Sequence, residues 1–293
     1  MPIHPNPIKV VLIGPGQIGI DLLYKISRSA LLECVLVIGK DINGQGIKHA
    51  EQMGFKTKAG GIDALIDSNE VYQLAFDATD ASFHKHHWDV LNKLGKRVID
   101  LTPSGIGHMI VPTEFSAADM NSKNFNLISC GGQAAIPILA DLSREFNTIE
   151  YTELITTASS PSVGRATRLN IDEYIYTTEA AIKAFTQIPN VKVMLNISAA
   201  FPIAFRVILH VKGIDIDFEK AKTIVLGSVR KVNEYVPGYR LLTLEKLEED
   251  HIYISVEVNG QEDFLPKYAG NLDIINSAAI FTAEKIACLN PDL

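Results

Sequence analysis

Two periodicities alternate through the first half of the chain. Short apolar runs of the kind found in buried parallel strands are followed by stretches in which apolar residues recur at helical spacing. The runs predict strands at residues 9–13, 33–38, 74–76, 97–99 and 125–129. The stretches between them predict helices at residues 18–26, 46–53, 62–66, 83–94 and 134–146. Because parallel neighbours need a crossover, this order predicts an α/β domain with a parallel sheet and helices on both faces.

After residue 150 the pattern changes to strands rich in β-branched and aromatic residues, several of which alternate in polarity. They lie at residues 150–156, 191–195, 205–211, 239–244 and 251–258. Helical segments at residues 171–185 and 218–233 interrupt them. We expect an α+β domain whose antiparallel sheet exposes one face to solvent. A final helix is predicted at residues 271–287, packed back on the first domain.

Composition narrows the class of protein. The 293 residues are 47% hydrophobic and carry a formal net charge of −7, so we expect large cores and no basic surface for nucleic acid. The longest uncharged apolar-rich run, residues 193–205, is too short to cross a membrane. Residues 1–9 contain no apolar core of the signal-peptide type. We therefore expect a cytoplasmic protein with no membrane and no nucleic-acid partner.

Side chains that often bind metals are scattered. Cys34, Cys130 and Cys288 are too few and too far apart for a disulfide framework or a zinc site, so reduced thiols are expected. Three histidines fall on one predicted helix, at positions 84, 86 and 87, and only the first and third share a face. We interpret these histidines as surface residues, with a place near the edge of the cofactor as the alternative, and expect no metal site.

A glycine-rich motif lies between the first predicted strand and the first predicted helix. It matches GxGxxG and consists of Gly14, Pro15, Gly16, Gln17, Ile18 and Gly19. In this place the first glycine permits a tight turn, the second admits a pyrophosphate to the backbone, and the third lets helix and strand pack closely. The helix N-terminus offers N–H groups and a positive dipole to the phosphates. The motif predicts dinucleotide binding, and the alternative is a tight turn without a ligand.

The preference between NAD and NADP depends on the residues after the second strand. An acidic residue about 20 positions beyond the glycines usually binds the ribose hydroxyl groups of NAD, and Asp41 lies there. Lys40 precedes it and is suited to a 2′-phosphate. We expect NAD as the cofactor and keep NADP as the alternative.

Cys130 is the candidate nucleophile. It follows the fifth predicted strand and precedes a predicted helix, at the edge of a parallel sheet where ligands bind. The helix dipole favours thiolate over thiol, and Gly131 and Gly132 leave room for a carbonyl and offer N–H groups to an oxyanion. The alternative is a small buried cysteine, which is how we interpret Cys34 and Cys288. A thiolate beside a nicotinamide predicts addition to an aldehyde, hydride transfer to NAD+ and a thioester passed to an acceptor.

Several segments, taken together, resemble one family. They are residues 13–19, 76–79, 99–103, 129–134, 167–173, 236–241 and 265–274. In order and combination they are similar to the acylating acetaldehyde dehydrogenases, which oxidise a short aldehyde to acyl-CoA with NAD+. The resemblance extends over nearly the whole chain. It implies a fold like that of glyceraldehyde-phosphate dehydrogenase, with a Rossmann-type dinucleotide-binding domain at residues 1–130, an α+β catalytic and dimerisation domain at 131–270, and a C-terminal helix at 271–293 that returns to the first domain.

The resemblance also assigns roles to residues. It makes Cys130 the nucleophile and coenzyme A the co-substrate. The residues expected to contact NAD are Pro15, Gly16, Gln17, Ile18, Ser162, Val163, Gly164, Arg165, Ala166, Thr167, Arg168, Leu169, Asn170 and, at the nicotinamide end, Asn271. Many members receive their aldehyde from a 4-hydroxy-2-oxo acid aldolase, so such an aldolase is a candidate partner. The second domain implies a homodimer or a larger homo-oligomer.

The chain departs from the family pattern at two places. The family loop usually reads Ser-Ala-Gly-Pro-Gly-Thr-Arg, whereas residues 162–168 read Ser-Val-Gly-Arg-Ala-Thr-Arg. The family also has an aspartate after an arginine, thought to deprotonate the thiol, and here Val207 follows Arg206. His210 shares a predicted strand face with Arg206, and a neutral imidazole suits a thiol base. His210 is therefore the candidate base, with a structural or solvent-facing histidine as the alternative.

Three functions are compatible with these residues. The first, which we favour, is an NAD-dependent acylating aldehyde dehydrogenase. The second is a semialdehyde or acyl-phosphate reductase on the same scaffold, in which Arg165, Arg168 and Arg206 would bind phosphate and carboxylate groups. The third is a non-catalytic NAD-binding subunit, suggested by Val207. Testing phosphate against CoA as the acyl acceptor separates the first two.

Overall fold

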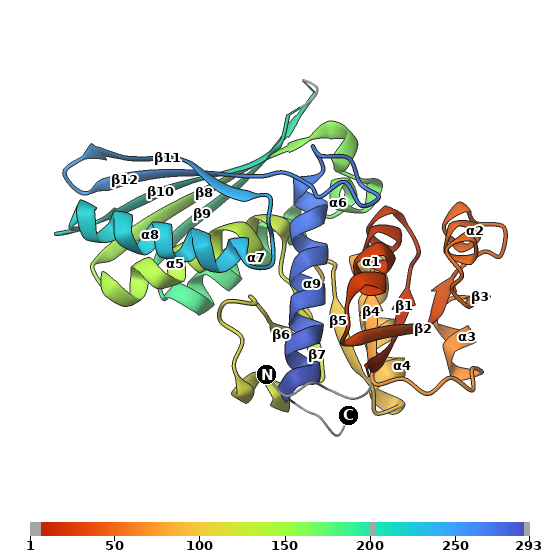
Figure 1. The fold of residues 1–293 in the computed structure, drawn as a ribbon. Helices are drawn as coiled ribbons and strands as arrows, with labels where there is room; N and C mark the ends of the chain where they lie inside the picture. The colour runs from red at the N-terminus through yellow and green to blue at the C-terminus, as the bar shows by residue number, and fades with distance from the viewer. Residues whose placement is uncertain (1–6, 200–202, 290–293) are drawn as a thin grey trace. The chain divides into compact units, whose positions relative to one another are not determined.

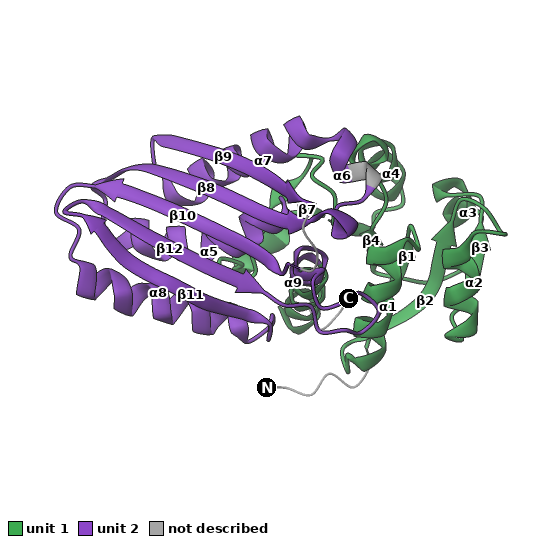
Figure 2. Ribbon diagram, turned by 90° about the horizontal axis from the view of Figure 1, so that it is seen from above, with its two compact units in different colours: residues 1–127, 276–293 green, residues 128–275 purple. Residues whose placement is uncertain are grey.

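The chain folds into two compact units. The computed structural model describes residues 7–199 and 203–289. The first unit comprises the described residues up to 127 together with those from 276 onward (Figure 2). The second comprises the described residues between 128 and 275. The chain therefore leaves the first unit once and returns to it through its last helix.

A seven-stranded sheet forms the centre of the first unit, in the order β3-β2-β1-β4-β5-β7-β6. Every neighbouring pair runs parallel, which confirms the predicted Rossmann-type arrangement. The strands are β1 (Ile8–Ile13), β2 (Leu32–Gly39), β3 (Thr57–Ala59), β4 (Leu74–Asp77), β5 (Arg97–Asp100), β6 (His108–Met109) and β7 (Asn124–Asn126). The strand order reverses between β1 and β4, and sheets of this kind bind ligands beyond the carboxyl ends of such strands.

Helices connect these strands. They are α1 (Gln17–Arg28), α2 (Gln45–Gln52), α3 (Ile62–Ile66), α4 (Ala81–Lys93) and the short 3-10 helix η1 (Ala117–Asn121). Helix α1 buries an apolar stripe that includes Ile20, Leu23 and Ile26. Helix α4 begins after Asp80, whose carboxylate accepts the backbone N–H of Ser82 and caps the helix. These helices start at the carboxyl ends of the strands, where the glycine turn also lies.

A five-stranded sheet in the order β11-β12-β10-β8-β9 forms the second unit. The strands are β8 (Ile149–Ser159), β9 (Asn190–Ser198), β10 (Phe205–Gly213), β11 (Tyr239–Glu248) and β12 (His251–Val258). The helices α5 (Cys130–Glu145), α7 (Ile171–Thr186) and α8 (Phe218–Asn233) lie along one face (Figure 1). Figure 2 looks onto the other face, which the described residues leave uncovered. Two short helices, η2 (Ser160–Ser162) and α6 (Arg165–Leu169), precede α7.

The second sheet is mixed rather than wholly antiparallel. Strand β10 runs antiparallel to β8 and β12, and β11 runs antiparallel to β12. Strand β9, however, pairs with β8 in parallel. Helix α7 lies between these two strands in the sequence and provides the crossover that parallel neighbours require. The prediction of an antiparallel sheet is therefore wrong at this edge.

The two element boundaries next to Cys130 differ from the prediction. Strand β7 ends at Asn126, and α5 already begins at Cys130. Between them Ile128 has a φ of +67°, a left-handed conformation that is rare for a β-branched residue. This sharp turn shortens the link, so that Cys130 is the first residue of the helix instead of a loop residue before it.

The last helix, α9 (Gly270–Leu289), runs from the second unit into the first. Within the first unit the amide of Asn276 donates to the carbonyl oxygen of Ile18 and to the carboxylate of Asp21. Lys285 donates to the carbonyl oxygen of Pro112. In the described ranges, no helix has both the length and the apolar character needed to span a membrane.

Candidate active site

The GxGxxG segment forms the turn between β1 and α1. Gly14 has a φ of +91°, and a Cβ there would meet Thr79 and Ala78. Gly19 lies against the carbonyl oxygen of Gly14, so a Cβ there would clash with the backbone. Gly16 precedes the first turn of α1, and a Cβ there would meet nothing within 4 Å. Open space therefore lies at the N-terminus of α1, where backbone N–H groups point out of the helix.

A pocket of about 410 Å³ adjoins this turn. The ends of β1, β2 and β4 and the beginning of α4 contribute to its lining, which includes Gly39, Lys40, Thr79 and Phe83. A concave, largely apolar pocket with a few polar groups is typical of a small-molecule site. Its place beside the glycine turn is the place of the adenosine in a Rossmann-type unit.

Lys40 and Asp41 have different positions at the end of β2. Lys40 lines the pocket. Asp41 is exposed and holds a turn, since its Oδ1 accepts the backbone N–H of Asn43 at 2.9 Å. Lys40 thus brings a positive charge to the pocket lining. Asp41, the acidic residue expected to bind the ribose, is the next residue in the chain.

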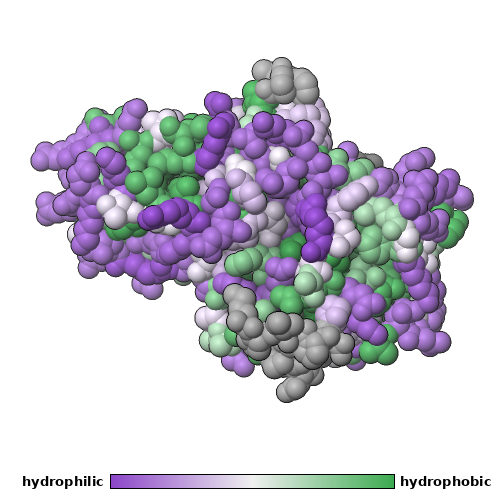
Figure 3. Space-filling view, in the orientation of Figure 1, coloured by the Kyte–Doolittle hydropathy of each residue, from purple (hydrophilic) through white to green (hydrophobic). Residues whose placement is uncertain are grey.

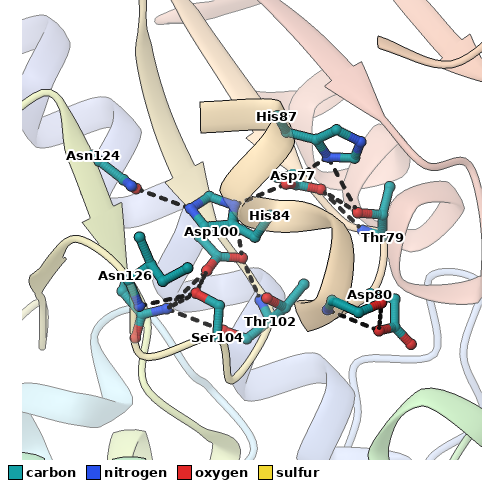
Figure 4. A network of polar contacts seen from close by, with 12 residues as sticks. Asp77, Thr79, Asp80, His84, His87, Asp100, Thr102, Ser104, Asn124 and Asn126 are labelled. Atoms are coloured by element: carbon teal, nitrogen blue, oxygen red, sulfur yellow. Dashed lines mark hydrogen bonds and ion pairs between the residues drawn. The ribbon is translucent and has the colours of Figure 1, made fainter. Parts of the chain in front are cut away.

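A buried polar network connects the strand ends with this pocket (Figure 4). Asp77 and Asp100 end β4 and β5 at the same register, and Nδ1 of His84 lies 2.8 Å from Asp77 Oδ2 and 3.5 Å from Asp100 Oδ1. Asp77 also accepts the hydroxyl of Thr79 at 2.6 Å and lies 2.9 Å from Nδ1 of His87. Since Thr79 and His87 line the pocket, the buried carboxylate orients two of its side chains.

The network stabilises ionised side chains in the protein interior. Burial opposes the ionisation of Asp77, but hydrogen bonds with His84 and His87 outweigh it and lower the pKa of this carboxyl. Burial also opposes the charge of His84, yet the contacts with Asp77 and Asp100 raise its pKa above the ordinary value. Burial raises the pKa of Asp100 to about 6. The three side chains could converge on a metal ion, but their ligand atoms already bind one another.

The interpretation of the three histidines as surface residues is wrong for two of them. His84 is fully buried and His87 is 7% exposed, whereas His86 is exposed. The first and third share the helix face that packs on the sheet. The signal that could have revealed them is the aspartate that ends each of two neighbouring buried strands, because such carboxylates need partners.

Cys130 begins α5 in the second unit, and its neighbours fix the start of that helix. The hydroxyl of Ser129 accepts the backbone N–H of Gly132 at 3.0 Å and contacts the hydroxyl of Thr178 on α7 at 2.7 Å. Gly132 therefore uses its N–H in the helix cap, and the expectation that it serves an oxyanion is not met. The N–H of Gly131 is directed at the sulfur and lowers the thiol pKa.

One hydroxyl group, that of Tyr174, lies next to the thiol of Cys130 and is itself bonded to a second. Its Sγ is 3.8 Å from Oη of Tyr174, which donates to the hydroxyl of Thr156 at 3.2 Å. Burial raises the pKa of the thiol to about 11, and the contact with Tyr174 opposes this effect. Sequence motifs did not reveal Tyr174 and Thr156, because they come from α7 and β8 and meet only through the fold.

Val207 occupies the position where the resemblance implies an aspartate. It is fully buried on β10 and pairs with Thr156 of β8, so both side chains lie on the helix-covered face of the sheet. A carboxylate in this place would face the Thr156 hydroxyl, and valine offers only methyl groups. No carboxylate of the described residues contributes to the pKa of Cys130.

His210 does not lie beside Cys130. It pairs with Glu153 and Tyr253 on neighbouring strands, and its Nδ1 lies 2.9 Å from Nε2 of His251. Because His210 is an odd number of residues from Val207 along β10, the two side chains point to opposite faces. The sheet separates the imidazole from the thiol, which contradicts the interpretation of His210 as the base within one subunit.

The loop expected to contact NAD runs through η2 and α6. Arg168 braces it, since its guanidinium donates to the carbonyl oxygens of Val163 and Ser160. The side chains of Arg165 and Ala166 lie outside the described part of the chain. The other expected contacts are buried Ser162, exposed Gly164, half-buried Thr167, exposed Leu169 and half-buried Asn170, which precedes α7.

The side chain of Asn271, near the start of α9, has two polar atoms in different situations. Its Nδ2 donates to the carbonyl oxygen of Ser162 at 3.1 Å. Its Oδ1 is buried and has no hydrogen-bond partner among the described residues. An unsatisfied buried acceptor is costly, so such an atom marks a place where a ligand donor fits.

The other cysteines and the expected phosphate-binding cations have different environments. Burial raises the pKa of Cys34 to about 12, and Cys288 is exposed near the chain end. Arg206 points to the uncovered sheet face and pairs with Glu257 at 3.0 Å. Neither Arg206 nor the loop-bracing Arg168 is directed at Cys130 in the way a phosphate-binding reductase would need.

Comparison with known proteins agrees with this geometry. A family model for the dimerisation domain of prokaryotic acetaldehyde dehydrogenase matches residues 130–266. An acetaldehyde dehydrogenase of Streptomyces griseus subsp. griseus is 43% identical over 95% of this chain and 90% of its own length. One of Spirochaeta aurantia is 39% identical over 98% of this chain and 97% of its own length.

A solved structure shares the fold. The aspartate semialdehyde dehydrogenase of Candida albicans, determined with NADP, has a TM-score of 0.66 at 10% identity and covers 96% of this chain and all of its own. The predicted fold, like that of glyceraldehyde-phosphate dehydrogenase, is confirmed by this likeness and by the two sheets. With relatives at about 40% identity over nearly its whole length, the chain belongs to the acetaldehyde dehydrogenase family.

Proposed function

We propose that this protein oxidises a short aldehyde to its acyl-CoA with NAD+, through a thioester on Cys130. The observation that carries the proposal is the place of this cysteine, as the first residue of α5 in a chain of this family. The helix dipole and the N–H of Gly131 favour the thiolate, which is the nucleophilic form.

The residues present fit a nicotinamide dinucleotide. The turn from Gly14 to Gly19 and the N-terminus of α1 would hold the pyrophosphate, with the adenosine in the adjoining pocket. The unpaired Oδ1 of Asn271 would accept the carboxamide N–H of the nicotinamide, with residues 162–170 beside it. When bound, the cofactor accepts a hydride. We propose NAD as this cofactor; the cation Lys40 in the pocket keeps NADP as the alternative.

The protein residues carry the acyl group through the reaction. The Cys130 thiolate adds to the aldehyde carbonyl, and the adduct loses a hydride to become an enzyme-bound thioester. The thiol of coenzyme A then attacks this thioester, which yields acyl-CoA and returns Cys130. Gly131 is the donor placed to stabilise negative charge beside the sulfur.

We also propose that the protein acts as a homodimer through its second unit, which is the part that the dimerisation model matches. A 4-hydroxy-2-oxo acid aldolase is proposed as the partner that supplies the aldehyde. Co-purification of the two proteins, followed by aldehyde transfer without release to solvent, would support this partnership.

An assay of NADH formation from acetaldehyde tests the proposed function. We expect sustained NADH formation, beyond one equivalent per Cys130, only when NAD+ and CoA are both present, and none from Cys130→Ser. The matched control is Cys288→Ser, which removes an exposed thiol and should keep full activity. Mass spectrometry of the enzyme with acetaldehyde and NAD+ but no CoA should find an acetyl group on Cys130. Activity that needs phosphate instead of CoA would contradict the proposal.

A non-catalytic NAD-binding subunit is the second candidate. The raised pKa of Cys130, together with valine in place of the family aspartate, favours it. In that case NADH binds normally, but acetaldehyde leaves no acetyl adduct and yields no NADH under any combination of cofactors.

A further inference from the structure

Among the described residues, no carboxylate acts on the thiol of Cys130 where the family pattern implies one, and a phenol lies at the sulfur instead. The thiol contacts the hydroxyl of Tyr174 and the backbone, with burial as the main effect on its ionisation. Tyr174 is 3% exposed, so its hydroxyl group is shielded from bulk water. The hydrogen-bond partners of this hydroxyl group are therefore groups of the protein.

Helix α7 holds this phenol at the sulfur through several contacts. The hydroxyl of Thr178 donates to the carbonyl oxygen of Tyr174 at 2.5 Å and contacts the Ser129 cap of α5. Gly131 leaves the space that the phenol fills, because a Cβ there would clash with Oη of Tyr174 and with Thr156. The sequence around Cys130 is thus shaped to bring a tyrosine to the thiol.

The hydroxyl proton of Tyr174 can have two settings, one toward the oxygen of Thr156 and one toward the sulfur of Cys130. The hydroxyl of Thr156 donates to the carbonyl oxygen of Met194 at 3.1 Å, so its oxygen is left to accept the proton of Tyr174. In this setting the thiol is neutral and can donate to the phenol oxygen. When the thiol ionises, the phenol proton can turn to the sulfur, since a hydrogen bond to a charged acceptor is stronger than one to a neutral hydroxyl.

We propose that Tyr174 is the hydrogen-bond donor that stabilises and positions the Cys130 thiolate, in place of the carboxylate that Val207 replaces. This role rests on the proposed function, because it concerns the same nucleophile. The thiol proton leaves to water, and Tyr174 keeps its own proton throughout. The hydroxyl of Thr156 competes with the sulfur for that proton and so sets how readily the thiol ionises.

Alkylation of the full-length protein by iodoacetamide, followed over pH with the adduct on Cys130 identified by mass spectrometry, tests the proposal. Tyr174→Phe removes only the hydroxyl group. We expect it to raise the apparent pKa of the thiol and to slow alkylation about tenfold near neutral pH. Tyr176→Phe is the matched control, since this tyrosine lies on the same helix and is 69% exposed, and its profile should equal the wild type.

Thr156→Val provides a variant with the opposite expected sign. It removes the competing acceptor with little change in shape, so the phenol proton turns to the sulfur and the thiol pKa falls. A purely structural role would shift both variants in the same direction. Shifts of the same sign, or a Tyr174→Phe profile equal to the wild type, would overturn the proposal.

The two proposals fail in different ways. If Cys130→Ser still oxidised acetaldehyde, the proposed function would be wrong, while the alkylation profiles would still decide the role of Tyr174. If Cys130→Ser is inactive and Tyr174→Phe alkylates like the wild type, the function stands and this inference is wrong. Thermal unfolding of each variant verifies that the fold is retained.

Discussion

At the scale of single residues, His84 is fully buried between two carboxylates. His84→Gln keeps a polar side chain of similar length but removes the positive charge. Removing one partner of a buried ion pair leaves an uncompensated charge and typically costs about 3–5 kcal/mol. We expect the free energy of unfolding to fall by about this amount. Chemical denaturation at neutral pH measures it.

The pH dependence of this variant has a definite sign. Because the pKa of His84 is raised in the folded protein, its contribution to stability is full below its ordinary pKa and is lost as the pH rises through the raised value. Asp77 has a lowered pKa, so its contribution is lost in acid. The penalty of His84→Gln should therefore be largest between these limits and shrink outside them. His86→Gln, on the exposed side of α4, should cost nearly nothing; an equal penalty for both would contradict the network.

The residues that the sequence revealed and those it did not differ in kind. Cys130 could be singled out as a candidate because its signal is local: a strand, a cysteine, two glycines and a helix in succession. Tyr174 and Thr156 could not, because their partnership with the thiol depends on how a helix and a strand meet. The choice of His210 as a base used the strand period correctly but lacked the knowledge of which face the helices cover.

At the scale of elements, two glycines of the turn before α1 allow folding and binding to be tested separately. A Cβ on Gly19 would clash with the carbonyl oxygen of Gly14, whereas a Cβ on Gly16 would meet nothing. Gly19→Ala should therefore destabilise the first unit by about 1–3 kcal/mol. Gly16→Ala should unfold like the wild type yet bind NAD more weakly, because its methyl group enters the space that we propose for the pyrophosphate.

Thermal unfolding and NADH fluorescence titration of the two variants measure these effects. If Gly16→Ala lost as much stability as Gly19→Ala, the absence of a side chain at Gly16 would be required for folding, and the proposed phosphate site would be wrong. Gly16→Ala thus serves both as the stability control for Gly19→Ala and as the probe for binding.

Long, strongly periodic elements were predicted well, and short or sharply turned ones were not. Strand β12 and helix α8 have the predicted bounds. Strands β3 and β6 were missed, since segments of two or three residues carry no measurable period. The start of α5 was placed too late because the left-handed Ile128 allows a turn that its residue type does not suggest.

At the scale of the whole molecule, the uncovered face of the second sheet is the surface suited to a second copy. Its centre is a row of apolar side chains, Met194, Ile155 and Ile208, paired across three strands. On either side of this row lie ion pairs, Lys192 with Glu153 and Arg206 with Glu257. An apolar centre with a polar rim is the usual composition of a protein interface.

Apolar side chains outside this row also reach the surface of the second unit. Figure 3 shows an apolar area on this unit. Leu226 of α8 is 42% exposed, on an element of the helix-covered side. Exposure of single apolar residues is normal for any protein surface. The sheet face combines an apolar row with flanking charges of both signs, which a two-fold axis could pair with themselves.

A charge placed in the apolar row should therefore separate the dimer. In Ile208→Arg, two guanidinium groups would be buried without partners near the two-fold axis, and burial of an unpaired charge is costly. We expect the dissociation constant of the dimer to rise about a hundredfold or more, as measured by light scattering over a dilution series. Leu226→Arg makes the same chemical change on the helix side and should leave the dimer intact. A dimer that survives Ile208→Arg and dissociates in Leu226→Arg would instead place the interface on the side of the second unit that α5, α7 and α8 cover.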